Sequence, residues 1–320
     1  MNRLNPFAAS RARRGFALTC LMLLLASPVA LAGQANANHV AADARWYLHL
    51  DLQAAKQTTL FNEVITAFKA QLPLDEIVGQ LKTAIGVNPL TDIDGITAYN
   101  NSFEQDVAAI IIYARVDVGR LNQALSQNPG YKETPYGKHM LLGWVDHNDG
   151  KPKTGCFYGD GILVMADKDD TLKRAIDVLD GAKPGGSSLV KTPAKGSFIN
   201  AAAALARVND QNVSQLLSNS EAATASVGEV DGKFTVNVNL TTKTPEQATQ
   251  IKKMLDGMAA FGQLAARELP AAAALLNDVN VAADGSKVIV TFQHDSKALL
   301  QTLQSIDQEN KSKATKKPAQ

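Results

Sequence analysis

The chain has 320 residues, of which 45% are hydrophobic, and its 32 basic and 31 acidic side chains give a formal charge of +1. This near balance lacks the basic excess that nucleic-acid-binding proteins use to attract phosphates. We therefore expect no nucleic-acid partner, and the length is ample for two folded cores.

The first 32 residues have the pattern of a secretory signal peptide. An uncharged run covers residues 16–32, with Pro28 near its end, and residues 30–32 (Ala-Leu-Ala) fit the A-x-A cleavage pattern. The basic residues before this run are Arg3, Arg11, Arg13 and Arg14. We expect cleavage after Ala32, with cleavage after Ala37 as the alternative; a retained membrane anchor is the other interpretation of a run this long.

Removing this segment takes away four arginines and no acids, so the mature chain would carry a charge of −3. No later apolar run is long enough to cross a bilayer. We therefore expect a soluble periplasmic or secreted protein with no stable membrane insertion. Cys156 would be its single cysteine, which rules out an internal disulfide and predicts a buried thiol, with pairing between chains as the alternative.

Strict alternation over residues 45–53 (RWYLHLDLQ) predicts a half-buried strand. One face would carry Trp46, Leu48, Leu50 and Leu52. The other would carry Tyr47, His49 and Asp51, as a polar face that is covered by a helix or open to solvent. Apolar residues at helical spacing then predict two helices, over residues 60–68 and 74–81, separated by Pro73.

The rest of the first half alternates between strand and helix patterns. Strands are predicted at 95–101, at 107–116, at 138–147 and twice within 156–167, and helices at 118–126 and 170–179. The dipeptide Asp160-Gly161 is a strong hairpin signal. Residues 182–196, rich in Gly, Pro, Lys and Ser, predict a linker or a long surface crossing between two halves.

The second half begins with an alanine-rich stretch, residues 198–208, that is compatible with a strand or a helix. Hairpins are predicted with turns at Asp231-Gly232 and at Asp284-Gly285. Helices are predicted from Pro245 with Thr244 as cap, from Pro270, and over residues 296–306. The lysine-rich residues 308–320 contain too few apolar side chains to fold, so we expect a disordered basic tail.

The predicted helix starts repeat at regular intervals. They fall at Asp117 and Asp169 in the first half and at Thr244 and Asp295 in the second, 52 and 51 residues apart. We therefore predict an α+β protein of two similar units, residues 33–181 and 197–307. Each would be an antiparallel sheet of hairpins with helices packed on one face.

Four stretches of the mature chain carry a resemblance that runs through most of its length. They are ADARWYLHLDLQAAKQT near its start, GKHMLLGWVD, GDGILVMADKDDTLKRAIDVLDG, and DGSKVIVTFQHDSKALLQTL near its end. In this order they resemble uncharacterised exported proteins of planctomycete-like bacteria. The resemblance implies an exported location and a shared fold. It implies no activity and no functional residue.

The candidate catalytic and metal-binding residues are histidines and aspartates. His139 and His147 would face the same side of one strand, but eight strand residues separate them by about 26 Å, too far for one metal ion. The aspartates Asp167, Asp169 and Asp170 could form an acid–base pair, but we interpret them as helix caps. No complete phosphate loop, calcium loop or serine-hydrolase elbow occurs in the sequence.

The sequence therefore favours an exported, non-catalytic protein without a cofactor that binds a protein partner, an envelope component or a small ligand. The alternative is a periplasmic hydrolase or metal-dependent enzyme that uses the histidines or nearby carboxylates. The candidate groove residues are Tyr47, His49, Asp51, His139 and His147.

Overall fold

The computed structural model describes residues 33–104, 108–146, 150–159, 161–206, 220–266 and 270–315. Side chains are described as far as residue 306, apart from that of Ala265. The predicted signal peptide, His147 and Asp160 lie outside these residues, so the structure does not bear on them.

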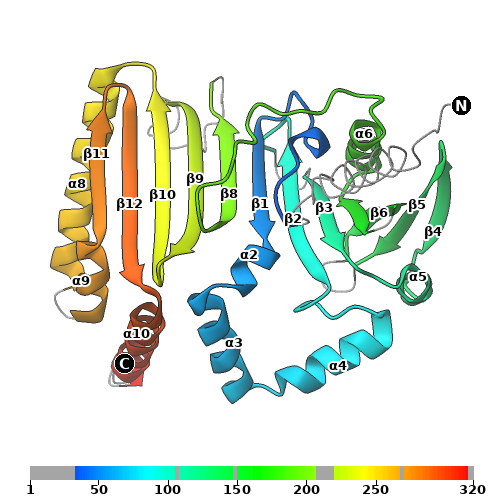
Figure 1. Ribbon diagram of the computed structural model, residues 1–320, viewed down its shortest axis with the longest axis horizontal. Helices are drawn as coiled ribbons and strands as arrows, with labels where there is room; N and C mark the ends of the chain where they lie inside the picture. The colour runs from blue at the N-terminus through cyan, green and yellow to red at the C-terminus, as the bar shows by residue number, and fades with distance from the viewer. Residues whose placement is uncertain are drawn as a thin grey trace, which may run out of the picture. The chain divides into compact units, whose positions relative to one another are not determined.

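The described strands form one antiparallel sheet of twelve, in the order β11-β12-β10-β9-β8-β1-β2-β3-β7-β6-β5-β4 (Figure 1). Their bounds are β1 (Trp46–Asp51), β2 (Ile93–Asn100), β3 (Ala109–Ala114), β4 (Lys132–Tyr136), β5 (His139–Val145), β6 (Pro152–Gly159), β7 (Ile162–Ala166), β8 (Ser197–Ala204), β9 (Ser220–Val230), β10 (Lys233–Thr242), β11 (Val279–Asp284) and β12 (Lys287–Asp295). The predicted α+β class with antiparallel strands is confirmed. The alanine-rich stretch, left open by the sequence, is strand β8.

The two predicted halves share this sheet because β1 pairs with β2 on one side and with β8 on the other (Figure 1). In this register Tyr47 lies between Tyr99 and Ala202, and His49 lies between Thr97 and Asn200. Main-chain hydrogen bonds thus run continuously from one half into the other. That each half is a unit in its own right stays a prediction.

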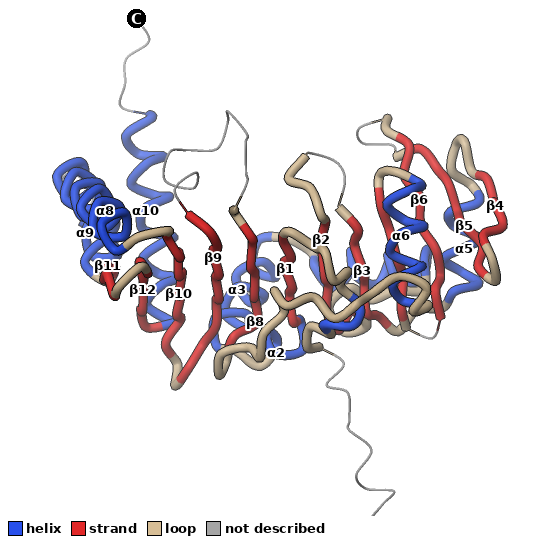
Figure 2. Tube along the Cα trace, turned by 90° about the horizontal axis from the view of Figure 1, so that it is seen from above, coloured by secondary structure: helices blue, strands red, loops and turns tan. Residues whose placement is uncertain are grey.

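The helices lie close to the residue ranges that the spacing of apolar residues predicts. They are η1 (Ala37–His39), α2 (Leu52–Lys56), α3 (Thr59–Gln71), α4 (Leu74–Ile85), α5 (Val118–Ser126), α6 (Asp169–Leu179), α8 (Pro245–Ala265), α9 (Pro270–Asn277) and α10 (Ser296–Thr315). The short helices η1 and α2 and the strand β4 were not expected. Helix α10 continues past Ile306, into the stretch whose composition predicted an unfolded tail. In Figure 2, α8 and α9 lie on one side of strands β10 to β12.

Three of the four predicted caps are present. Asp117 accepts from Arg120 N at 3.0 Å, Thr244 caps α8 ahead of Pro245, and Asp295 accepts from Ala298 N at 2.9 Å. The interpretation of the aspartates after β7 as residues that start a helix is confirmed for Asp169 and Asp170, but neither is the N-cap: α6 starts after Lys168 with no side-chain cap bond. Asp169 and Asp170 are instead in the first turn, where their charge favours the helix dipole, and the third aspartate, Asp167, forms an ion pair with Lys153 at 2.6 Å.

Strand β1 buries its polar face, although hydrophobicity alone would favour burial of the opposite, apolar face. The side with Tyr47, His49 and Asp51 is buried, whereas Leu48 on the other side is 45% exposed. The polar side is buried because the chain before β1 and the loop before β8 line the space over it, and Gly33 O accepts a hydrogen bond from His49 Nε2. A buried polar group with such partners avoids the desolvation penalty that would otherwise oppose this arrangement.

The loop over residues 182–196, here called the strap, is bonded to the segment before β1. Pro184 O accepts from Ala42 N at 2.9 Å, and Ala37 O accepts from Gly186 N at 2.9 Å. Ser187 is buried. Composition predicted a linker or a long surface crossing, and the first part of the strap has tertiary contacts of its own. Its later part, from Lys191, leads over the β1 pocket described below.

Candidate functional site

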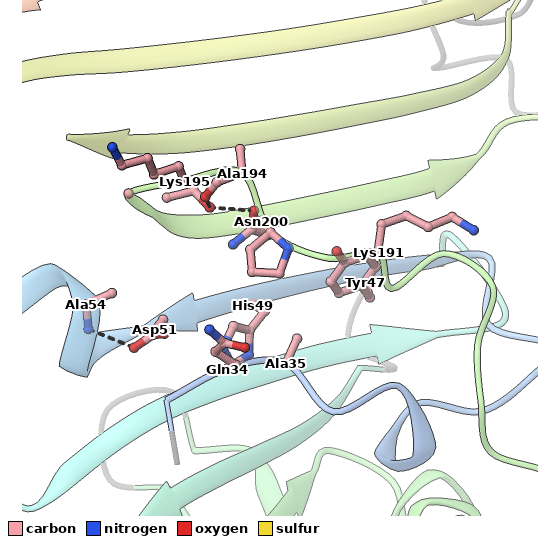
Figure 3. A pocket seen from close by; sticks show the side chains of 13 residues that line it. Gln34, Ala35, Tyr47, His49, Asp51, Ala54, Lys191, Ala194, Lys195 and Asn200 are labelled. Atoms are coloured by element: carbon pink, nitrogen blue, oxygen red, sulfur yellow. Dashed lines mark hydrogen bonds between the residues drawn. The ribbon is translucent and has the colours of Figure 1, made fainter. Parts of the chain in front are cut away.

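The residues singled out on β1 line a cavity of about 230 Å³, here called the β1 pocket (Figure 3). Tyr47, His49 and Asp51 form its floor, and Asn200 of β8 lies beside them. Its other lining residues come from the segment before β1 (Gln34, Ala35), from α2 (Ala54), and from the strap and the start of β8 (Lys191, Pro193, Ala194, Lys195, Gly196, Ser197).

His49 is held on both ring nitrogens inside the protein. Its Nε2 lies 2.6 Å from Gly33 O, which can only accept, so Nε2 carries the proton and donates. Nδ1 then accepts from the Thr97 hydroxyl at 2.8 Å. Burial lowers the pKa of this imidazole, against smaller opposing effects of the Gly33 carbonyl and the Asp51 charge. A neutral ring with no free nitrogen is suited to hold Gly33 in place, not to bind a metal or to act as a base.

Asp51 ends β1 and starts α2. Its side chain accepts from Ala54 N at 2.8 Å, which caps the helix (Figure 3). The carboxylate also lies directly against Gly33, where an added Cβ would meet Oδ1 at 2.2 Å. Among the described residues no lysine or arginine is paired with it.

A buried network continues from His49 across the sheet. The Tyr113 ring packs edge-on against His49, and its hydroxyl lies 3.0 Å from Nδ1 of His39. Burial raises the pKa of Tyr113 to about 12 and lowers the pKa of His39. These groups are therefore neutral at physiological pH, and the network joins the segment before β1 to the sheet.

The structure does not bring His139 to this pocket. Four strands, β2, β3, β7 and β6, separate its strand from β1 in the sheet. His139 instead lies 3.0 Å from the Asp180 carboxylate and stacks on Tyr158 with ring centroids 4.9 Å apart. The predicted groove therefore contains Tyr47, His49 and Asp51 without His139, and His147 is outside the described residues. Within the described part of the chain no three His, Cys, Asp or Glu residues are grouped to hold a metal ion.

Cys156 is buried, as predicted. Burial, with a smaller contribution from the Asp180 charge, raises the pKa of its thiol to about 11. Since thiolate is the reactive form, we expect labelling by a disulfide reagent at pH 8 to be on the order of a hundredfold slower than for an exposed cysteine. Native and guanidinium-unfolded protein should be compared by release of the chromophore. Rapid labelling of the native protein, or a dimer that reduction separates, would contradict this expectation.

A second cavity, of about 410 Å³, lies on the opposite face of the sheet. We call it the tryptophan groove because both tryptophans of the chain, Trp46 and Trp144, line it together with Ile110 and Met165. Strand register places all four side chains on one face, since Ile110 pairs with Met165 and side chains alternate along each strand. Trp46 is oriented by its Nε1, which donates to Ser102 O at 2.7 Å.

The rim of the tryptophan groove is charged and has more acid than base. Glu104, Asp146 and Asp167 line it with one basic residue, Lys153, which is paired with Asp167. Among the described residues of this lining, the acidic side chains outnumber the basic ones by three to one. The arrangement joins an apolar, aromatic floor to an acidic edge, as in pockets that bind small organic ligands.

Sequence reasoning did not find the tryptophan groove. Alternation correctly placed Trp46 on one face of its strand, but Trp144 was read only as part of a histidine-containing strand. The signal available was that both tryptophans of the chain fall on predicted strands. The positions of the two tryptophans in the sheet follow from the pairing order β1-β2-β3-β7-β6-β5. Local sequence patterns do not specify that order.

Fold and cavities together define an α+β protein with one large antiparallel sheet and an aromatic groove on one face. No protein-family model and no curated protein matches the chain. Solved structures of TP0453 resemble it at 9% identity: crystal form III with a TM-score of 0.46 over 85% of this chain and 98% of that one, and crystal form I with 0.45 over 86% and 99%. At this level the likeness carries no inference about activity, ligand or partner.

In the described part of the chain, no helix combines the length and the apolar composition required for a membrane span. The helices do expose several large apolar side chains on their outer faces, among them Phe68, Ile77, Met258 and Phe261. These lie on α3, α4 and α8, away from the residues that line the tryptophan groove.

Proposed function

We propose that this chain is an exported, non-catalytic protein that binds a small molecule with an apolar body and a cationic end in the tryptophan groove. The observation that carries the proposal is the convergence of both tryptophans on one groove whose described lining includes three acidic side chains and one basic. Export is supported by the signal-peptide pattern of residues 1–32.

Size and chemistry both favour such a ligand. A cavity of about 410 Å³ is within the range that small-molecule sites occupy, roughly 300–1,000 Å³. Indole rings bind apolar groups by area and also attract cations through the ring face, by about 0.5–2 kcal/mol. The acidic rim adds attraction for a cation and repels an anion.

A non-catalytic role is supported by the state of the residues that an enzyme would use. Both nitrogens of His49 are engaged in internal hydrogen bonds. His139 is paired with Asp180, and the Cys156 thiol has a raised pKa. None of these groups lines the tryptophan groove, so its described lining contains no cysteine and no histidine.

Intrinsic fluorescence tests the proposal directly, because all tryptophan emission of this chain comes from residues that line the groove. We expect decyltrimethylammonium, below its micelle concentration, to change the emission in a saturable way. Decyl sulfate, which has the same apolar tail and the opposite charge, should bind at least tenfold more weakly. Equal binding of the two would contradict the assigned charge preference, and no saturable change with either would overturn the site.

Met165→Lys should weaken decyltrimethylammonium binding by tenfold or more, since it places a positive charge in the groove. Met254→Lys is the matched control, because Met254 is an exposed methionine on α8 that does not line the groove. Far-UV circular dichroism should show both variants folded. If the two substitutions weaken binding equally, the ligand does not occupy the groove.

A further inference from the structure

Gly33, the first described residue, is buried and held by specific contacts. Its carbonyl accepts from His49 Nε2 at 2.6 Å. A Cβ at Gly33 would meet Asp51 Oδ1 at 2.2 Å, which is closer than any side-chain carbon can approach. A side chain at this position would therefore have to displace the carboxylate beside it.

Asp51 is 8% exposed, and its one described hydrogen bond is from Ala54 N to Oδ1. A buried carboxylate without a cation is costly, which makes a positive partner favourable here. The basic side chains in the described lining of the pocket are Lys191 and Lys195 of the strap, and in Figure 3 both point away from Asp51. His49, the neighbour on β1, is neutral because both its nitrogens are engaged as described.

We propose that cleavage between Ala32 and Gly33 creates an α-ammonium group that docks on the Asp51 carboxylate, so that removal of the signal peptide completes the fold around the β1 pocket. The proposal rests on the export proposed above. It assigns to residues 32 and 33 a processing site, and to Asp51 the role of positioning the new N-terminus.

The geometry allows this pairing with little movement. The Gly33 nitrogen and the position of a Cβ are both attached to the same Cα, so the nitrogen lies within roughly 5 Å of Oδ1 by standard backbone dimensions. Once residue 32 is removed, rotation about the Cα–C bond of Gly33 moves the nitrogen toward the carboxylate. The same rotation leaves the carbonyl bonded to His49.

The contacts also distinguish between the two cleavage sites that the sequence left open. Cleavage after Ala37 would remove Gly33 and leave His49 Nε2 without its acceptor. It would also remove Ala37 O, which accepts from Gly186 N in the strap, and Asn36, which caps η1. Cleavage after Ala32 preserves all of these contacts.

Processing and docking can be measured on one preparation. The full chain is expressed in an exporting bacterial host, the processed protein is purified, and its mass is determined. A mass that begins at Gly33 is expected. A protein that begins at Asn38 would overturn the docking proposal and leave export standing, whereas an intact Met1 would contradict export itself.

The processed protein is then treated with an acetylating reagent, and α-amino acetylation at Gly33 is followed by peptide mass spectrometry. We expect the α-amine to react at least tenfold more slowly than in Asp51→Asn. Asparagine can still accept the Ala54 hydrogen bond and cap α2, so this variant removes only the charge. Asp117→Asn, the same change at the exposed cap of α5, should leave the rate unchanged. Equal rates in the wild type and Asp51→Asn would overturn the docking while leaving export intact.

A second measurement uses the wild type alone, in case Asp51→Asn does not fold. An α-amino group in an unfolded chain has a pKa of about 7.7–8.0, and pairing with a carboxylate raises it in the folded state. Its contribution to stability is therefore present below about pH 7.7 and is lost as the pH rises through the folded value. Acetylation of the α-amine should abolish this alkaline loss. An identical alkaline profile before and after acetylation would contradict the proposal.

Discussion

Replacing Gly196 by alanine should lower the free energy of unfolding by about 2–5 kcal/mol. Gly196 has φ +74°, in the left-handed region that disfavours any side chain, and a Cβ there would meet Glu229 O at 2.3 Å. The obstacle is a backbone atom fixed in the sheet, since Glu229 N donates to Gly196 O at 3.0 Å. Backbone strain and steric overlap therefore act together where the strap enters β8.

Two other glycines separate these effects. Gly232 has φ +73° with open space where a Cβ would lie, so Gly232→Ala should show the strain alone, about 1–2 kcal/mol. Gly257 lies in α8 with open space and no positive φ, so Gly257→Ala should raise stability by about 0.5–1 kcal/mol. Urea unfolding of the three variants measures the series. Equal losses at Gly196 and Gly232 would show that overlap with Glu229 contributes nothing.

His49→Phe is the second substitution with a large expected effect. It retains an aromatic ring of similar shape but removes the donor to Gly33 O and the acceptor for the Thr97 hydroxyl. Each buried group left without a partner costs about 1–3 kcal/mol. Thr97→Val should lower the free energy of unfolding by about 1–3 kcal/mol, because it removes the hydroxyl bonded to Nδ1. Thr97→Ser keeps the hydroxyl and is the control. A cost for His49→Phe no larger than that for Thr97→Ser would contradict the bonding described.

The same histidine predicts a dependence of stability on pH. Burial lowers the pKa of His49 and of His39 below the ordinary value of 6.5. The unfolded chain therefore binds protons at these residues before the folded protein does, so their effect destabilises the fold as the pH falls below about 6.5. Unfolding free energies at pH 7.5 and pH 5.0 should differ less in His49→Phe than in the wild type. An unchanged difference would show that His49 does not titrate as described.

Local patterns in the sequence determined the element types over most of the described chain. Asp231 and Gly232 have φ of 51° and 73°, the paired positive values that a two-residue turn requires, and they join β9 to β10 as expected. Thr244 and Pro245 start α8 at the predicted residues. Caps, turns and periodicity act over a few residues, so they can be read without knowing what packs against them.

The tertiary structure alone decided which face of β1 is buried. Alternation separated Tyr47, His49 and Asp51 from Leu48, but burial depends on what lies over each face. Segments distant in sequence cover the polar side. Gly33 O accepts a hydrogen bond from His49, and the strap lines the pocket above it. A hydrogen-bonded polar face can be buried where an apolar residue such as Leu48 remains exposed, and no local pattern specifies that partner.

Strand pairing likewise decided the arrangement of the sheet and of the tryptophan groove. The sequence predicted hairpins and helices that repeat in two halves, but the pairing of β1 with β8 depends on contacts across the whole chain. The same pairing order sets Trp46 and Trp144 on one groove, whereas it leaves His139 far from His49. Local propensity fixes each element, and the choice of neighbours follows from which faces can be buried together, a property of the assembled sheet.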